Sequence, residues 1–126
     1  MLSEKVLRKM LSAASLSGCT SVPAGAGLYN DSYLIDSEQG RFVLRIAPPD
    51  DVPKLFYEVD MMRSEPGIHE LVLERTDVPA AKVVHYDFNR RIIDRDYLIL
   101  EHLEGQPGRF DQRELGRYVR QLHAIT

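Results

Sequence analysis

Two residues of opposite charge lie among apolar neighbours, where a charge needs a partner or a function. Arg45 lies in the alternating stretch 42–46, on the same strand face as Val43. Glu58 lies inside the apolar stripe of the helical segment that follows. A carboxylate in such a stripe is costly unless it is paired, and a guanidinium held by a carboxylate can bind phosphate oxygens. A second interpretation stays open, in which Arg45 reaches out to water and Glu58 makes a weak surface pair.

A glycine-containing loop is the second candidate for anion binding. Gly25 and Gly27 lie between two expected strands, and glycines allow the backbone to come close to a phosphate group. The loop matches neither a P-loop nor a complete dinucleotide-binding pattern. Most glycine-rich loops between strands are only turns, so the pattern alone leaves that simpler interpretation in place.

The third candidate is the apolar run 97–100, which leads through a short connector to Gly105. A strand that ends leaves backbone donors and acceptors unpaired, and these groups can bond to the edge of a flat heteroaromatic ring. An ordinary linker between two structural units has a similar composition, so the run by itself does not decide between the two.

The composition argues against several classes of function. The 126 residues suit one domain, and a net charge of −3 without any basic run argues against nucleic-acid binding. A single cysteine rules out an internal disulfide and favours a cytoplasmic location. No apolar run approaches the ~20 residues that a membrane helix needs, so no membrane contact is expected. The four histidines are scattered, so no metal site is expected.

The elements that position the candidate residues follow from hydrophobic periodicity and from helix and strand breakers. Strands are predicted at 19–23, 31–36, 41–46, 82–86 and 92–101. Helices are predicted at 3–16, from Val52 to a break or bend at 64–67, from there to Arg75, and from an Asp111 cap to Leu122. Together these elements predict an α+β fold, a twisted antiparallel sheet of about five strands with a helix between the third and fourth strands and further helices beside it.

Taken in order, these segments resemble the N-terminal lobe of the aminoglycoside phosphotransferase family, a group of kinase-like enzymes that act on small molecules. The resemblance covers nearly the whole chain, from about Cys19 to Thr126. It is carried by six stretches in the family's order, at 27–34, 40–46, 57–62, 77–84, 97–105 and 115–124. Each stretch is loose, and the specificity comes from their order. With the resemblance, the functional interpretation of Arg45 and Glu58 outweighs the alternative.

The resemblance implies a protein-kinase-like lobe in which the first two candidates surround the phosphates of a nucleotide. Arg45 stands where the family has its phosphate-contacting lysine or arginine. Glu58 stands where the family has the helix glutamate that pairs with it. The loop at 24–30, which includes Gly25, Gly27 and Asn30, would cover the phosphates.

At the other end of the nucleotide, the resemblance assigns the strand-end candidate to the base. Leu100 would lie at the back of the adenine pocket, and the Glu101 carbonyl and the Leu103 amide would bond to the adenine edge. The whole enzyme would move the γ-phosphate of ATP or GTP to the hydroxyl of a small molecule.

The resemblance also implies how the chain is divided. It predicts an N-terminal helix at 1–18, a nucleotide-binding N-lobe at 19–104, and a connector with the start of a C-terminal lobe at 105–126. In this family the catalytic loop and the metal-binding loop belong to that C-terminal lobe, and neither follows Leu122 here. We therefore expect no catalytic or metal-binding residue in this chain, magnesium only together with the missing lobe, and no phosphate transfer by the chain alone.

The last helix leads to an alternative function. Leu115, Val119 and Leu122 form an apolar stripe on it, and little of the chain remains to cover them. This predicts contact with the missing lobe, with a partner chain or with a second copy. The alternative to a nucleotide-binding lobe is accordingly a non-catalytic interaction module that uses this helix to bind a partner.

Overall fold

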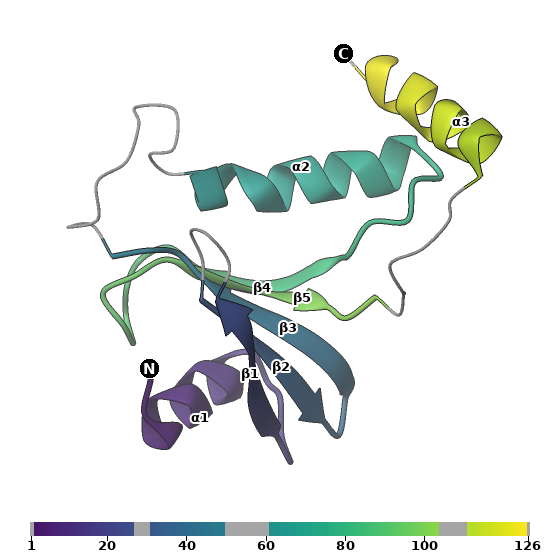
Figure 1. The fold of residues 1–126 in the computed structure, drawn as a ribbon. Coiled ribbons are helices and arrows are strands. Elements are labelled where there is room, and N and C mark those ends of the chain that lie inside the picture. Colours follow the sequence, from purple (N-terminus) through teal and green to yellow (C-terminus); the bar gives the residue numbers. More distant parts are fainter. Residues whose placement is uncertain (1, 27–30, 50–60, 104–110, 126) are drawn as a thin grey trace.

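The computed structural model describes residues 2–26, 31–49, 61–103 and 111–125. Five strands in these ranges form one antiparallel sheet in the order β1-β2-β3-β5-β4 (Figure 1). The strands are β1 (Thr20–Ala26), β2 (Asp31–Ser37), β3 (Gly40–Ile46), β4 (Val83–Asp87) and β5 (Tyr97–Glu101). The helices are α1 (Glu4–Ala13), α2 (Met61–Arg75) and α3 (Gln112–His123). The predicted α+β fold, with a helix between the third and fourth strands, is confirmed.

The sheet has a helix on each face, with α1 below it and α2 above it in Figure 1. Strand alternation divides the core into two clusters. The larger cluster joins α1 to one face of the sheet, and its buried members are Leu7, Met10, Leu11, Leu16, Tyr33, Ile35, Leu44, Ile46, Tyr97 and Ile99. The smaller cluster joins Met62 of α2 to Leu98 and Leu100 on the other face. Strand β5 therefore contributes to both clusters and lies between the two helices.

Helix α1 begins as the sequence predicts. The Ser3 hydroxyl accepts a hydrogen bond from the Val6 N–H at 3.3 Å, which satisfies one of the free donors of the first turn. The Asp111 carboxylate caps α3 in the same way, with the Arg113 N–H at 2.8 Å. No helix among the described residues is both long enough and apolar enough to span a bilayer.

Of the break or bend predicted at 64–67, the break is wrong, because α2 continues through Pro66. Proline within a helix removes one backbone hydrogen bond and costs about 3 kcal/mol in a helix interior. Contacts with the sheet compensate for this cost. Met62, one turn earlier, is 4% exposed, and Glu65 is ion-paired to a strand residue. Tertiary contacts in this segment outweigh the local preference of the sequence.

The last strand is shorter than predicted, since β5 covers 97–101 and not 92–101. Ile92 and Ile93 both pack against the cluster on the α1 side of the sheet. Consecutive residues of a strand point to opposite faces, so two neighbours that pack on one side cannot belong to a regular strand. Arg90, two residues before Ile92, has a φ of 56°, which lies in the left-handed region and not in the strand region.

Tyr97 carries a buried polar group in the centre of this core. Its side chain is fully buried, and its hydroxyl has no hydrogen-bond partner among the described residues. The His85 ring lies 6.0 Å away, centroid to centroid. Burial, with a smaller effect from the Asp87 carboxylate, raises the pKa of Tyr97 to about 12.

The Tyr97 pKa predicts a loss of stability at alkaline pH. A tyrosine ionises near pH 10 in the unfolded chain and near pH 12 in the fold, so raising the pH from 9 to 11 favours unfolding by about 1 kcal/mol. Urea unfolding at the two pH values measures this loss. We expect Tyr97→Phe to remove most of it, and Tyr86→Phe, at an exposed tyrosine, to retain it. Equal pH dependence in parent and Tyr97→Phe would contradict the assignment.

Candidate functional site

Arg45 lies in the middle of the sheet, on the face that α2 covers. Alternation along β3 places it on the side opposite Leu44 and Ile46, which are fully buried in the α1 cluster. Its register partners are Ser32 on β2 and Leu98 on β5. A guanidinium here starts from an apolar sheet surface and extends toward the first turns of α2.

The carboxylate that holds Arg45 in the structure is Glu65 of α2. The pair is bidentate, with Nη1 to Oε2 at 2.6 Å and Nη2 to Oε1 at 3.2 Å. The two side chains are only 26% and 23% exposed, so the pair is better shielded from water than a surface ion pair. Two of the five guanidinium donors are used in this contact, which leaves donors for a second acceptor such as a phosphate oxygen.

Glu58, the predicted partner, lies outside the described residues, so that pairing remains a prediction. Sequence reasoning missed Glu65 because the Pro66-Gly67 pair indicated a break. The spacing could have revealed Glu65, because it lies three residues after Met62 and four before His69, and residues at this spacing share one face of a helix. Reading the helix as continuous would have placed this carboxylate over the sheet.

A row of apolar side chains crosses the same face of the sheet beside Arg45. Successive register pairs connect Val22 to Leu34, Leu34 to Val43, Val43 to Leu100 and Leu100 to Val83. The row is buried under α2 at Leu100, 7% exposed, and it emerges at Leu34 and Val22, which are 42% and 60% exposed. Its exposed end is a flat apolar surface next to a held cation.

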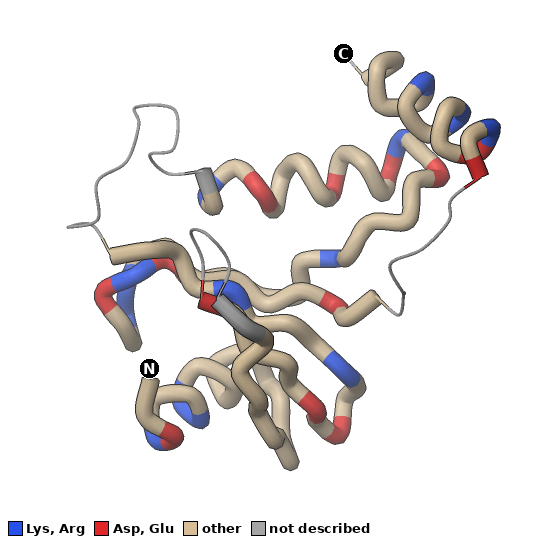
Figure 2. The backbone as a smooth tube through the Cα atoms, in the orientation of Figure 1, with Lys and Arg blue, Asp and Glu red and all other residues tan. Residues whose placement is uncertain are grey.

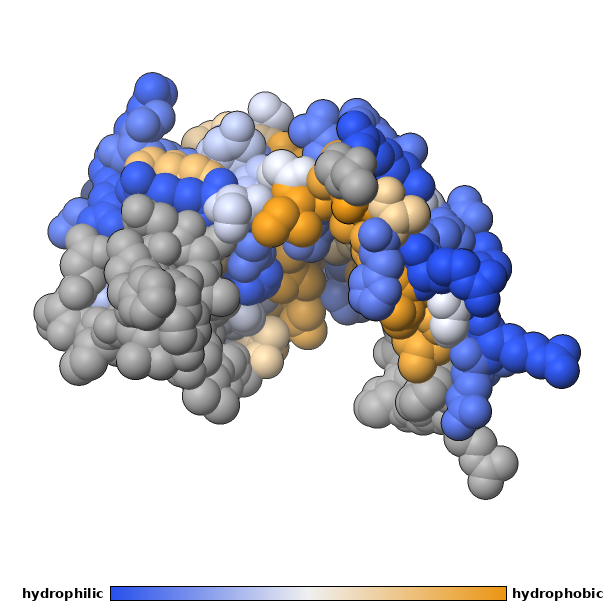
Figure 3. Space-filling view, turned by 90° about the horizontal axis from the view of Figure 1, so that it is seen from above, coloured by the Kyte–Doolittle hydropathy of each residue, from blue (hydrophilic) through white to orange (hydrophobic). Residues whose placement is uncertain are grey.

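Seen from above, the molecule is hollowed on one side, and hydrophobic side chains gather in the middle of the molecule and along the hollow (Figure 3). Sequence reasoning did not single out Val22 or Leu34. The sequence gives only a weak sign that these two residues are exposed, because the exposure of an apolar strand residue depends on which face of the strand a helix covers.

The glycine loop joins β1 to β2 close to Arg45. Its described ends, Ala26 and Asp31, are register partners, and Asp31 also pairs with Ile46, the neighbour of Arg45. Gly25 belongs to β1, whereas Gly27 and Asn30 lie outside the described residues. The topology therefore brings both ends of the loop close to Arg45, and the loop's predicted contacts with phosphates stay predictions.

The strand-end candidates lie at the opposite end of β5. The Glu101 N–H donates to the Lys82 carbonyl at 2.9 Å, and the His102 N–H donates to the Arg41 carbonyl at 3.1 Å. Leu103 is 52% exposed and is the last described residue before 111. Leu100 of the apolar row and Glu101 are the last two residues of β5, and Leu103 follows just after the strand. Their contacts with a base stay predictions.

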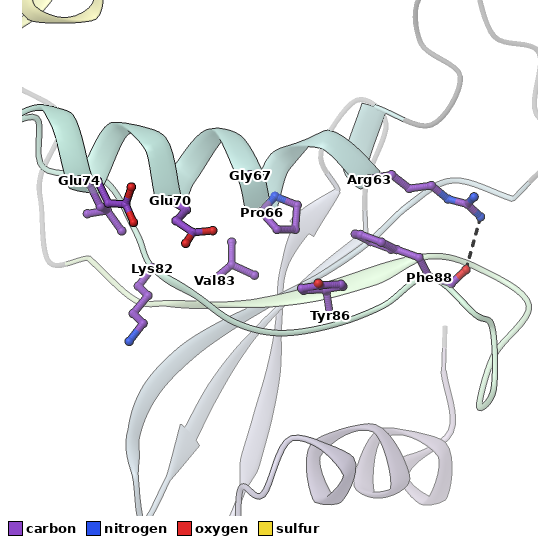
Figure 4. Close-up of a pocket in the computed structure, with 10 residues that line it drawn as sticks. Arg63, Pro66, Gly67, Glu70, Glu74, Lys82, Val83, Tyr86 and Phe88 are labelled. Carbon is purple, nitrogen blue, oxygen red and sulfur yellow. Dashed lines mark hydrogen bonds between the residues drawn. The ribbon is translucent and has the colours of Figure 1, made fainter. Parts of the chain in front are cut away.

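A separate groove of about 690 Å³ lies on the other flank of α2. Pro66, Gly67 and Glu70 line it from the helix, and Val83, Tyr86 and Phe88 line it from β4 and the residue that follows (Figure 4). Its aromatic floor consists of Tyr86 and Phe88, whose stacked rings have centroids 4.9 Å apart. Neither Arg45 nor Glu65 lines this groove, so it is distinct from the candidate anion site. In the described ranges, no three potential metal ligands come together.

Comparisons with known proteins identify the family and the fold. The sequence profile of the Phosphotransferase enzyme family (APH) matches residues 20–126. A crystal structure from Ralstonia eutropha JMP134, of a protein provisionally assigned as an aminoglycoside phosphotransferase, matches with a TM-score of 0.60 and 16% identity. The match covers 84% of this chain and 29% of that one. At this identity the likeness shows a shared kinase-like fold. No functionally curated protein matches the chain significantly.

Proposed function

Because the chain belongs to the phosphotransferase enzyme family, we propose that it forms the nucleotide-binding N-lobe of an enzyme that moves the γ-phosphate of ATP or GTP to a small-molecule hydroxyl. One observation carries the proposal. Arg45 is held by Glu65 beside an apolar row that emerges from under α2 at Leu34 and Val22. A cation next to a flat apolar surface suits a molecule with a phosphate group at one end and an aromatic base at the other.

In this proposal each part of the sheet contacts one part of the nucleotide. Arg45 donates to phosphate oxygens while Glu65 keeps its guanidinium in place. The exposed row carries the base on its flat side. Leu100 closes the back of the pocket, and the Glu101 carbonyl and the Leu103 N–H bond to the base edge. Gly25, near the end of β1, covers the phosphates together with Gly27 and Asn30, which follow in the loop between β1 and β2.

The chemical step is assigned to residues outside this chain. The chain spans 29% of the length of the solved relative. We propose that a C-terminal lobe supplies the acceptor site, the base that accepts the hydroxyl proton and the ligands of magnesium. On this proposal residues 19–104 are the N-lobe and 105–126 lead into the second lobe, and the 126-residue chain alone binds nucleotide without transferring phosphate. A cytoplasmic location remains a proposal as well.

Nucleotide titration tests the proposal directly. We expect ATP or GTP to raise the melting temperature of the chain and to give saturable heat in calorimetry, and adenosine or guanosine to bind more weakly because they lack phosphates. Inorganic triphosphate, which lacks the base, is the matched control for the apolar row, and it should bind more weakly than ATP or GTP. Absence of saturable binding by both ATP and GTP at millimolar concentration would overturn the proposed function.

The second candidate function, an interaction module, is favoured by the surface of α3. This helix has no buried residue, and its stripe of Leu115, Val119 and Leu122 is between 39% and 46% exposed. It is attached to the rest of the described chain through Asp77, which pairs with Arg117 at 3.1 Å. An amphipathic helix with its apolar side uncovered is suited to docking on another surface.

The α3 stripe predicts association that is independent of nucleotide. We expect sedimentation of the parent to show self-association or capture of a partner, and the double variant Val119→Asp with Leu122→Asp to abolish it. The double variant Arg113→Ala with Arg120→Ala, on the polar side, should leave it intact. Association that persists in the aspartate variant would contradict a role for the stripe.

A further inference from the structure

Charged residues of both signs gather on the loop between β4 and β5 (Figure 2), and Arg63 near the start of α2 reaches this loop. Asp96 is at the centre, and its side chain is 6% exposed. Arg63 of α2 holds this carboxylate with two bonds, Nε to Oδ2 at 2.9 Å and Nη2 to Oδ1 at 3.3 Å. Arg90 adds a contact to Oδ1 at 3.4 Å. A carboxylate this buried is costly unless charged donors surround it, so its place beside α2 calls for a reason.

Arg63 and Glu65 leave opposite flanks of α2, because two residues turn a helix by about 200°. Met62 points to the sheet between them, where it is 4% exposed and belongs to one cluster with Leu98 and Leu100. The start of α2 is therefore attached at three points. Arg63 contacts the residue before β5, Met62 contacts β5 itself, and Glu65 contacts Arg45 on β3.

The two ion pairs have opposite polarity. On one flank the helix supplies the cation and the sheet side supplies Asp96, and on the other flank the helix supplies Glu65 and the sheet supplies Arg45. If α2 rolled so that the partners exchanged, Arg63 would meet Arg45 and Glu65 would meet Asp96, and like charges would repel. An apolar contact such as that of Met62 allows a small roll, whereas this pattern of charges permits one rotational setting.

We propose that Asp96 and Arg63 are positioning residues for the nucleotide site, which set the rotation of α2 so that Glu65 keeps both oxygens on Arg45. The inference rests on the proposed function, since a bound nucleotide is what a held Arg45 would contact. The bidentate contact between Arg45 and Glu65 is sensitive to small movements of the helix, because a shift of about 1 Å breaks one of its bonds. Neither positioning residue contacts the nucleotide in this proposal.

A double-variant cycle tests whether Asp96 acts through Glu65. MgATP affinity is measured by calorimetry, well below the melting temperature, for the parent, Asp96→Asn, Glu65→Gln and the double variant of the full chain. We expect each single variant to weaken binding about tenfold, and the double variant to bind no more weakly than the worse single variant. Two results would overturn the positioning role. In the first, the affinity losses of the two single variants multiply in the double variant. In the second, Asp96→Asn lowers the melting temperature but leaves MgATP affinity unchanged.

A second measurement does not depend on nucleotide. Bidentate pairing slows rotation of the guanidinium, so the Nη protons of Arg45 should give NMR signals in the parent, assigned by their loss in Arg45→Lys. We expect Asp96→Asn to broaden these signals and Asp96→Glu to restore them. If the parent binds no nucleotide, the proposed function fails while this arm still tests the positioning, and unchanged Arg45 signals in Asp96→Asn would overturn it.

Two further variants complete the design. Asp94→Asn is the matched control, since this carboxylate is in the same loop, is 95% exposed and contacts only Arg90 among the described residues. It should change neither MgATP affinity nor the Arg45 signals. If Asp96→Asn does not fold, Arg63→Gln removes the same ion pair from the partly exposed side and is expected to give the same two results.

Discussion

The Arg45→Ala protein is expected to gain no thermal stability from MgATP under conditions where the parent gains several degrees. A charged donor contributes about 1.5–3 kcal/mol to a hydrogen bond with phosphate, so the loss of Arg45 corresponds to a decrease in affinity of about 10- to 100-fold. Titration calorimetry of parent and variant measures this decrease. Equal stabilisation of the two proteins by MgATP would show that the site is wrongly assigned.

Two controls separate binding from folding in this experiment. Arg41→Ala removes a cation from the same strand, and that side chain is 65% exposed and paired with Asp36 at the surface, so MgATP affinity should not change. Arg45→Ala also leaves Glu65 without its partner, which costs stability. Arg45→Met combined with Glu65→Leu removes both charges, and it should recover stability without recovering nucleotide binding.

Deletion of residues 1–18 is expected to prevent folding, although the family profile begins only at residue 20. Helix α1 packs against one face of the sheet, and Met10 is fully buried there. Its removal would expose the side chains of β2, β3 and β5 that form the larger core cluster. The deletion also removes four buried members of that cluster, Leu7, Met10, Leu11 and Leu16. A chain of this size has too little stability to lose that much of its core and remain folded. Circular dichroism and gel filtration of residues 19–126 test this.

A point substitution tests the same interface without shortening the chain. Met10→Ala should cost about 2–5 kcal/mol of unfolding free energy, because the cavity it leaves is enclosed by α1 and the sheet. Lys9→Ala, one residue earlier and exposed, should change stability by less than about 0.5 kcal/mol. A Met10→Ala protein as stable as the parent would mean that α1 is only loosely attached.

Most of the fold could be predicted from the sequence because its signals are local. Alternation indicated the strand of Arg45 and its face, and Ser3 and Asp111 marked two helix starts through their own side chains. The helix continuing through Pro66 and the shortened β5 could not be predicted in this way. Both depend on contacts with segments distant in sequence, which outweigh local preference.

The candidate site was predicted in part for the same reason. Arg45 was found because a cation on an apolar strand is unusual within its own neighbourhood. Its observed partner Glu65 is twenty residues away, and only the placement of α2 over the sheet joins the two. Val22 and Leu34 became visible only through the register of the sheet, since exposure on one face of a strand is set by what packs there.

The order of the strands has a consequence for how the protein folds. Strands β1, β2 and β3 form one run of neighbouring hairpins, β4 and β5 form a second local pair, and the β3–β5 pairing, as between Ile46 and Tyr97, is the seam between them. Pairing β3 with β5 closes the long segment between Ile46 and Tyr97, and this closure costs chain entropy before the contacts of the two strands form. The seam is therefore expected to form after the two local units. Arg45 lies on β3, on one side of the seam, and Leu100 lies on β5, on the other side. Glu65 lies on α2, in the segment that connects β3 to β4. A chain arrested before the seam closes would contain most of its secondary structure, but the residues of the proposed nucleotide site would not yet be assembled.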